Sequence, residues 1–413
     1  MDNRNTLFHK TIIVLLVAGI VVNFFRLHIQ SDNLSSFMGD LKLLYVACEA
    51  FTKGENPYNR IGLQKIWQNI PDDEKIVADS KLQLGPFMYP PFVLILFQPV
   101  AFIQWNIAAY LMFGMNILLV AGIIVLIGML GNFFHLKYEM VLFFLLLAAS
   151  KLVHLSLMVG QHFFVSFFFG LLSLYFSRVE RNNLAVISLS LCFVKPTIAF
   201  PFFLYFFFLK EYRICFYSFC IVLCSNLFAI PFMPLEAMQT YFQEVALSLD
   251  TGHINDYTLQ NPRFFHITGI QTLLYLGLNS AIVISIVKYM IAGLMIAFSL
   301  YKKRNFKNEP YNIILFYTFF SLFFVYHQFS DTIALILVLI TFKPTQLFKS
   351  LGWRIVFLIP FLFPVTGLVT MLKNLLPSLV YHVAALNIQI SITMLFIFWM
   401  VMLHKNMKSR ITA

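Results

Sequence analysis

Continuous apolar runs, most of them about 15 to 25 residues long, recur along the whole chain between short polar connectors. A bilayer core about 30 Å thick is crossed by about 20 residues of α-helix. Only helices and closed barrels satisfy every backbone polar group in lipid. Because these runs are continuous and do not alternate, the pattern predicts an all-α, polytopic integral membrane protein with about twelve transmembrane helices.

Two longer polar stretches divide this pattern. One apolar segment within the first stretch, residues 91–103, is too short to cross a membrane and contains Pro99, so we expect an interfacial or re-entrant helix there. We therefore expect one integral membrane unit over residues 1–413, made of a first extracytoplasmic loop at 28–105, a central transmembrane module at 106–231, a second extracytoplasmic loop at 232–280 and C-terminal transmembrane helices at 281–413.

The distribution of charged residues predicts how the chain is oriented across the membrane. Only 11% of the residues are charged, and the formal net charge is +11. The N-terminal segment and the alternate connectors on its side of the membrane carry 17 of the 29 lysines and arginines but only 5 of the 18 acidic residues. Basic residues concentrate in cytoplasmic loops, so we expect both termini in the cytoplasm and no nucleic-acid partner.

Cysteines and short motifs exclude several kinds of site. The five cysteines show no CxxC spacing, so the sequence predicts neither a disulfide framework nor a metal site. Cys48 alone lies outside an apolar run and is expected to be exposed. No GxGxxG, Walker, HExxH or GxSxG motif is present in the sequence.

Under this topology the unusual polar residues share the outer face. Polar groups at membrane helix ends are costly unless they are paired or hydrated, so we expect them to line a single cavity that opens outward. The group comprises an acid, Asp40; the cationic or imidazole side chains Lys195, Arg263, His162 and His327; and the hydrogen-bonding side chains Tyr58, Tyr89 and Gln161.

Each of these residues also has an ordinary structural explanation. Asp40 precedes LKLLYVACEAF, whose apolar spacing fits a helix lying on the bilayer, and Asp is a favoured N-cap. Lys195 could extend to the interface, Gln161 could cap a turn, and Arg263 or the histidines could be solvated. The residues by themselves leave these alternatives open.

Four segments carry a resemblance to a known family: DLKLLYVACEAFTKGENPYN, YPPFVLILFQPVAFI, GQHFFVSFFFGLLSLYF and SLCFVKPTIAFPFFLYFFFLKEYR. Together they resemble glycosyltransferase family 87, which belongs to the GT-C superfamily of polytopic enzymes that use polyprenyl-phosphate sugars. YHQFSD stands where the family has a histidine in a late outer loop. The likeness is strongest over roughly residues 30 to 215. One departure is NPY at 56–58, where many relatives have a DPY-like turn.

The resemblance implies an extracytoplasmic hexosyltransferase, with mannose as the first candidate sugar. It implies a polyprenyl-phosphate donor, a lipid-linked or glycan acceptor, and the bacterial cytoplasmic membrane as location. Asp40 then stands where the family has its essential acid and would be the general base of an inverting transfer. Lys195, His327, Arg263 and His162 would bind the donor phosphate, and Tyr58, Tyr89 and Gln161 the substrate. No metal or other cofactor is implied, and the polyprenyl chain would lie in a groove between the Phe-rich stretches 163–169 and 200–208.

The main alternative is a polytopic transporter or flippase of lipids or glycans. Transporters often have internal repeats with interrupted helices in matching positions, and this sequence shows no repeat. An assembly protein without chemistry would have no use for a cavity of Asp, Lys and His. Another branch of the same superfamily, acting on a pentose or an aminopentose, stays open because pocket shape decides the sugar.

Overall fold

The computed structural model describes residues 39–70, 87–130 and 151–247, with isolated positions between 266 and 328. The segment before the expected first loop, most of the expected C-terminal transmembrane helices, and Arg263 lie outside the described residues. The chain forms two compact units, the first comprising residues 1–149 and 153–256 and the second residues 150–152 and 257–413. The helices that bear on the candidate site belong to the first unit.

The described part of the first unit is helical. Its α-helices are α2 (Gly39–Thr52), α3 (Arg60–Asn69), α4 (Pro91–Phe97), α5 (Trp105–Leu130), α7 (Lys151–Val159), α8 (Phe163–Arg178), α9 (Asn182–Cys192), α10 (Pro196–Phe208), α11 (Tyr212–Ala229) and α12 (Glu236–Leu247), with 3-10 helices η3 (Gln98–Phe102) and η5 (Ile230–Phe232). Among the described residues, two helices are long and apolar enough to cross a membrane: the 26-residue α5, and α11 continued through η5. The expectation of a helical membrane protein is thus confirmed, and the number of spans stays a prediction.

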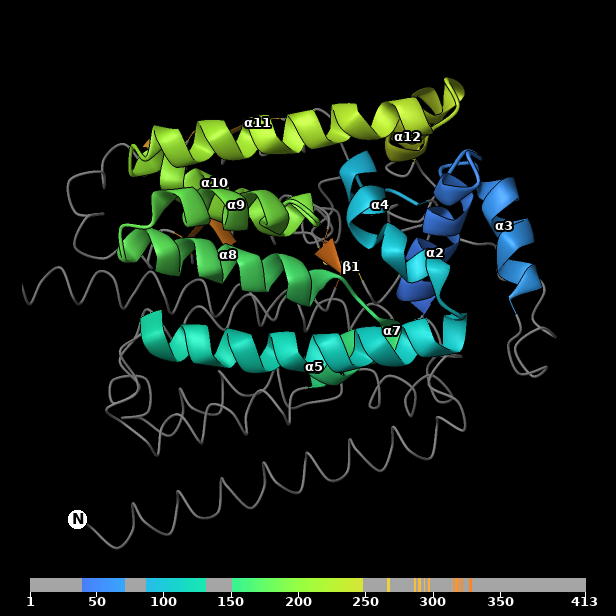
Figure 1. Ribbon diagram of the computed structural model, residues 1–413. Helices are drawn as coiled ribbons and strands as arrows, with labels where there is room; N and C mark the ends of the chain where they lie inside the picture. The colour runs from blue at the N-terminus through green and yellow to red at the C-terminus, as the bar shows by residue number, and fades with distance from the viewer. Residues whose placement is uncertain are drawn as a thin grey trace, which may run out of the picture. The chain divides into compact units, whose positions relative to one another are not determined.

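The helices α5, α8 and α11 run in roughly the same orientation, with α5 packed against α8 and α11 packed against α9 and α10, and their two ends differ (Figure 1). The short helices α2, α3, α4 and α12 gather at one end, and the α8–α9 and α10–α11 turns lie at the other. This separation follows from chain direction, because consecutive apolar helices joined by short turns run antiparallel. We call the first end the loop end and the second the turn end.

Helix α8 packs against α5, α9 and α10. Its Gly170 touches Phe202 of α10 so closely that a Cβ atom at Gly170 would lie 2.6 Å from that ring, and small residues allow such approach in membrane bundles. Phe163, Phe167 and Phe206 are also fully buried. The expected lipid groove is therefore wrong for these side chains, because the Phe-rich faces of α8 and α10 pack against each other.

Helix α2 departs from the helix on the bilayer that its apolar spacing predicts. It is buried on nearly every side, and even Lys42, which is 3% exposed, lies inside. Cys48 is 0% exposed, so the expectation of an exposed cysteine is wrong. The physical reason is that α3, α4, η3 and α5 all pack around α2 and cover its polar face as well as its apolar one.

The short apolar segment at 91–103 forms helical structure of the expected length. Helix α4 ends at Phe97, and the chain continues as the 3-10 helix η3 through Pro99, because proline lacks the N–H that an α-helix interior needs. Asn226 of α11 accepts a hydrogen bond from the backbone N–H of Phe92 at 3.1 Å. The segment thus packs on α2 and α11 and ends where the sequence predicts.

The second unit contributes one departure from the all-helical expectation. Strands β1 (His266–Ile267) and β2 (His327–Gln328) pair antiparallel, with Ile267 opposite His327. Two-residue strands are too short to leave a periodic signal in a sequence.

Candidate active site

The turn between α7 and α8 presents two polar side chains at the loop end. Gly160 has a φ of 67°, a left-handed conformation that glycine adopts without steric cost. Its N–H donates to Leu157 O at 3.3 Å, and the N–H of Gln161 donates to Ser156 O at 3.0 Å. These two bonds are the Schellman motif that ends many helices. The motif fixes the backbone of Gln161, and α8 begins two residues later.

The side chain of Gln161 contacts helix α2. Its amide Nε2 donates a hydrogen bond to Oδ2 of Asp40 at 2.9 Å, joining residues 121 positions apart. Asp40 is half-buried in the first turn of α2, where the helix dipole favours an ionised carboxylate. N-capping of α2 does not account for a bond to the turn between two other helices. The structure therefore brings the expected acid together with one of the expected substrate-binding residues.

His162 lies beside Gln161 and faces the first loop. Its ring is 1% exposed. Its Nδ1 lies 3.3 Å from the hydroxyl of Tyr89, and its ring meets those of Tyr89 and Phe97 edge-on. Burial, and then the charge of Lys195, lower the pKa of His162 to about 3. The imidazole is therefore neutral at physiological pH, and its Nε2 is buried with no hydrogen-bond partner among the described residues.

Lys195 lies at the turn between α9 and α10, where it is the N-cap residue of α10. Ser166 of α8 holds this turn: its hydroxyl donates to Cys192 O and lies 3.3 Å from Lys195 O. The lysine is half-buried, and its charge acts on His162. Nothing in the sequence distinguishes Ser166 from the other serines within these apolar helices.

The NPY turn at 56–58 holds the backbone of Tyr89 through Tyr58. The hydroxyl of Tyr58 donates to Tyr89 O at 3.2 Å, and Tyr58 is 0% exposed. Asn56 Oδ1 accepts the N–H of Tyr58 at 3.0 Å, and Asn56 Nδ2 donates to the Thr240 hydroxyl on α12 at 3.0 Å. Thr240 in turn donates to Glu236 O. Asn at this position thus fits better than Asp, because an aspartate would place a carboxylate against a hydroxyl whose proton is already committed.

A buried lysine, Lys42, lies in α2 and carries no signal in the sequence. Lys42 lies with its Nζ 4.6 Å from the ring of Trp67 and 5.9 Å from that of Trp105, a cation–π arrangement. Burial lowers the pKa of Lys42 to about 8. A lysine in the first turn of a helix does not by itself predict contact with tryptophans from two other elements.

The roles expected for two of the phosphate-binding residues stay predictions. Arg263 lies outside the described residues, and His327 belongs to the second unit, where only its backbone pairing is described. Within the described ranges, no three His, Cys, Asp or Glu side chains are grouped so that they could hold a metal ion.

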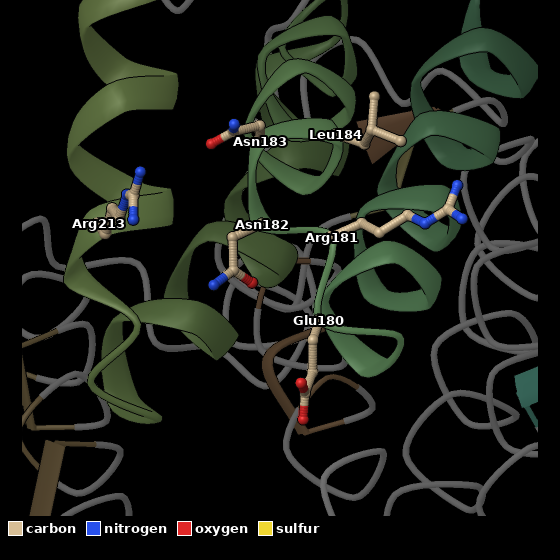
Figure 2. A pocket seen from close by; sticks show the side chains of 6 residues that line it. All are labelled: Glu180, Arg181, Asn182, Asn183, Leu184 and Arg213. Carbon is tan, nitrogen blue, oxygen red and sulfur yellow. The ribbon is translucent and has the colours of Figure 1, made fainter.

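The turn end carries polar and charged side chains that are mostly exposed. A hollow of about 430 Å³ is lined by Glu180, Arg181, Asn182, Asn183, Leu184 and Arg213. Figure 2 shows Arg213 of α11 facing the start of α9, while Arg181 extends away from it. Most of these residues are exposed, and none is among those that the sequence predicts for the outer-face site.

Comparison with known proteins assigns the family. A model of glycosyltransferase family 87 matches residues 87–325, more than half of the chain. The match includes the α7–α8 turn and Lys195, begins after Asp40 and Tyr58, and extends beyond residue 215, where the likeness of the four segments weakens. No curated protein and no solved structure matches. The chain therefore belongs to glycosyltransferase family 87 and is a membrane-embedded glycosyltransferase.

Proposed function

We propose that this glycosyltransferase moves a hexose, mannose being the first candidate, from a polyprenyl-phosphate donor to a lipid-linked or glycan acceptor. Transfer takes place on the extracytoplasmic face of a bacterial cytoplasmic membrane and inverts the anomeric carbon. The observation that carries the proposal is the α7–α8 turn, where Gln161 donates a hydrogen bond to Asp40 and the adjacent, buried His162 lies within the electrostatic influence of Lys195.

Asp40 is the general base in this proposal. The acceptor hydroxyl loses its proton to the Asp40 carboxylate while its oxygen forms a bond to the anomeric carbon of the sugar. The bond between that carbon and the phosphate oxygen breaks in the same step. A single displacement of this kind needs one carboxylate and no covalent enzyme intermediate, and a positioned base contributes about a hundredfold or more to the rate.

Lys195 and His162 act on the leaving phosphate. The donor is a phosphodiester with one negative charge, and the polyprenyl phosphate that leaves is a monoester with up to two. A nearby cation therefore binds the leaving group more strongly as the reaction proceeds, which is the condition for catalysis. Lys195 supplies the charge. His162, neutral at physiological pH, supplies a hydrogen bond through Nε2 when its Nδ1 accepts the proton of Tyr89.

Further residues extend the site. Tyr89 and Tyr58 would shape the sugar pocket, and His327 and Arg263 stay candidates for binding the donor phosphate. Exposed aromatic side chains such as Phe200 and Phe207 remain available to the polyprenyl chain. Both termini would then lie in the cytoplasm, with the loop end outside.

The test is donor use by the purified, lipid-reconstituted protein. We expect it to consume polyprenyl-phosphate-mannose, release polyprenyl phosphate and leave GDP-mannose untouched. Use of a polyprenyl-phosphate pentose instead would correct the sugar alone. Movement of an intact lipid-linked sugar across the bilayer, with no sugar transferred, would replace the proposal with the transporter alternative.

A further inference from the structure

The hydrogen bond of Gln161 indicates a role other than the substrate contact that the sequence suggests. Gln161 is 6% exposed, and its amide nitrogen donates a hydrogen bond to Asp40. An ionised carboxylate can only accept hydrogen bonds, so the amide nitrogen, and not the amide oxygen, must face Asp40. A glutamine held in this way acts on the acid and not on the sugar.

We infer that Gln161 is a positioning residue, which orients the Asp40 carboxylate and keeps it ionised for proton abstraction. The inference rests on the proposed function, because it needs Asp40 to be the base. It adds to that function the residue that prepares the base, and it assigns this task to an element 121 residues away in the sequence.

Three features of the structure carry the inference. The first is the direct bond of 2.9 Å, which fixes one carboxylate oxygen and so the plane of the group. The second is the rigidity of the donor, because the Schellman motif at Gly160 anchors the backbone of Gln161 to Ser156 O. The third is burial, since a charge-assisted bond shielded from water is stronger than one in solvent.

The same turn serves both halves of the proposed reaction. Gln161 faces Asp40, where the proton leaves the acceptor, and the adjacent His162 faces Tyr89, beside the proposed phosphate site. Because the two residues are neighbours on one anchored turn, the distance between the base and the leaving-group donor is set by the backbone.

The sharpest variants are Gln161→Met, which keeps the length and removes the donor, and Gln161→Glu, which puts a second carboxylate beside Asp40. Gln104→Met serves as the matched control, because Gln104 is an exposed glutamine of the same unit. Loss of a hydrogen bond to a charged group corresponds to about a tenfold to hundredfold effect. We expect Gln161→Met to lower kcat by that factor with little change in the KM for donor.

The pH profile separates positioning from simple structural support. A hydrogen bond to the ionised form favours that form, and two adjacent carboxylates disfavour double ionisation. The acid limb of kcat should therefore move to higher pH in Gln161→Met, and further, by a pH unit or more, in Gln161→Glu. Gln161→Asn, whose amide is one methylene shorter, should recover part of the rate. A variant that is only less stable would lose activity equally at every pH.

Infrared titration provides a readout that does not need catalysis. The carboxylic-acid band that disappears in Asp40→Asn identifies Asp40, and in the Gln161→Glu protein this band should persist to higher pH than in the wild type. If the wild type transfers no sugar but the band still shifts, the proposed function fails while the Asp40–Gln161 coupling stands. An unshifted band, or unchanged kcat and acid limb in Gln161→Met with active wild type, would overturn the inference about Gln161.

Discussion

The α7–α8 turn and the α8–α9 turn close helices with the same backbone motif and have opposite chemistry. At the loop end, Gly160 adopts the left-handed conformation and is followed by the buried Gln161 and His162. At the turn end, Glu180 adopts it with a φ of 60° and is followed by the exposed Arg181, whose N–H donates to Phe176 O at 2.8 Å.

The difference lies in what covers each turn. Elements of the first loop pack at the loop end, so polar side chains there lose water and must find partners, as Gln161 finds Asp40 and His162 finds Tyr89. At the turn end the charges stay in solvent around an open hollow. Burial of polar groups thus makes one turn the candidate site, while the exposed basic turn would lie in the cytoplasm under the proposed topology.

The largest effect is expected from side-specific labelling, which is nearly all-or-none. With Cys220 and Cys224 replaced by serine, single cysteines in place of Gln68 and Asn183 report the loop end and the turn end, respectively. An impermeant maleimide should label Gln68→Cys in intact cells and Asn183→Cys only after permeabilisation. Labelling of both from the same side would break the comparison and the topology on which the proposed function depends.

The next largest effect is expected from removing one cation at each end, Lys195 at the loop end and Arg213 at the turn end. Lys195→Ala should lower kcat/KM for the donor by about tenfold to hundredfold, because it removes a charge that faces the developing phosphate dianion. Lys195→Arg should recover activity only in part, since a planar fork replaces a point charge. Arg213→Ala, at the turn end, should leave transfer within a factor of about two of wild type. Equal losses in Lys195→Ala and Arg213→Ala would show that net charge, and not this site, matters.

The smallest effect concerns the backbone of the two turns. Gly160→Ala should cost about 1–2 kcal/mol of stability, because an alanine is strained in the left-handed region. Glu180→Gly removes such strain and should change stability by less than about 1 kcal/mol, in either direction. Thermal unfolding in detergent measures both. A destabilisation by Glu180→Gly as large as that by Gly160→Ala would mean that the side chains, and not the backbone, hold these turns.

The sequence predicts features that depend on neighbouring residues or on overall hydropathy. The short helix before Pro99, the turn at Gly160 and the grouping of polar residues at one end all follow from local pattern and charge. The prediction for α2 fails because apolar spacing describes one face of a helix, whereas four other elements cover the remaining faces and bury Cys48 and Lys42. The Asp40–Gln161 bond could not be predicted, since nothing local relates residues 121 positions apart.

The central claim, that Asp40 is the base at the loop end, is tested most directly by Asp40→Asn. Asn has the shape of Asp, and its amide oxygen can still accept the hydrogen bond from Gln161, so the variant should express, keep its melting temperature and bind the polyprenyl-phosphate donor. Single-turnover sugar transfer by this protein should fall about a hundredfold or more relative to wild type. A well-folded Asp40→Asn protein that transfers sugar at close to the wild-type rate would contradict the account and leave Asp40 as a residue that supports α2.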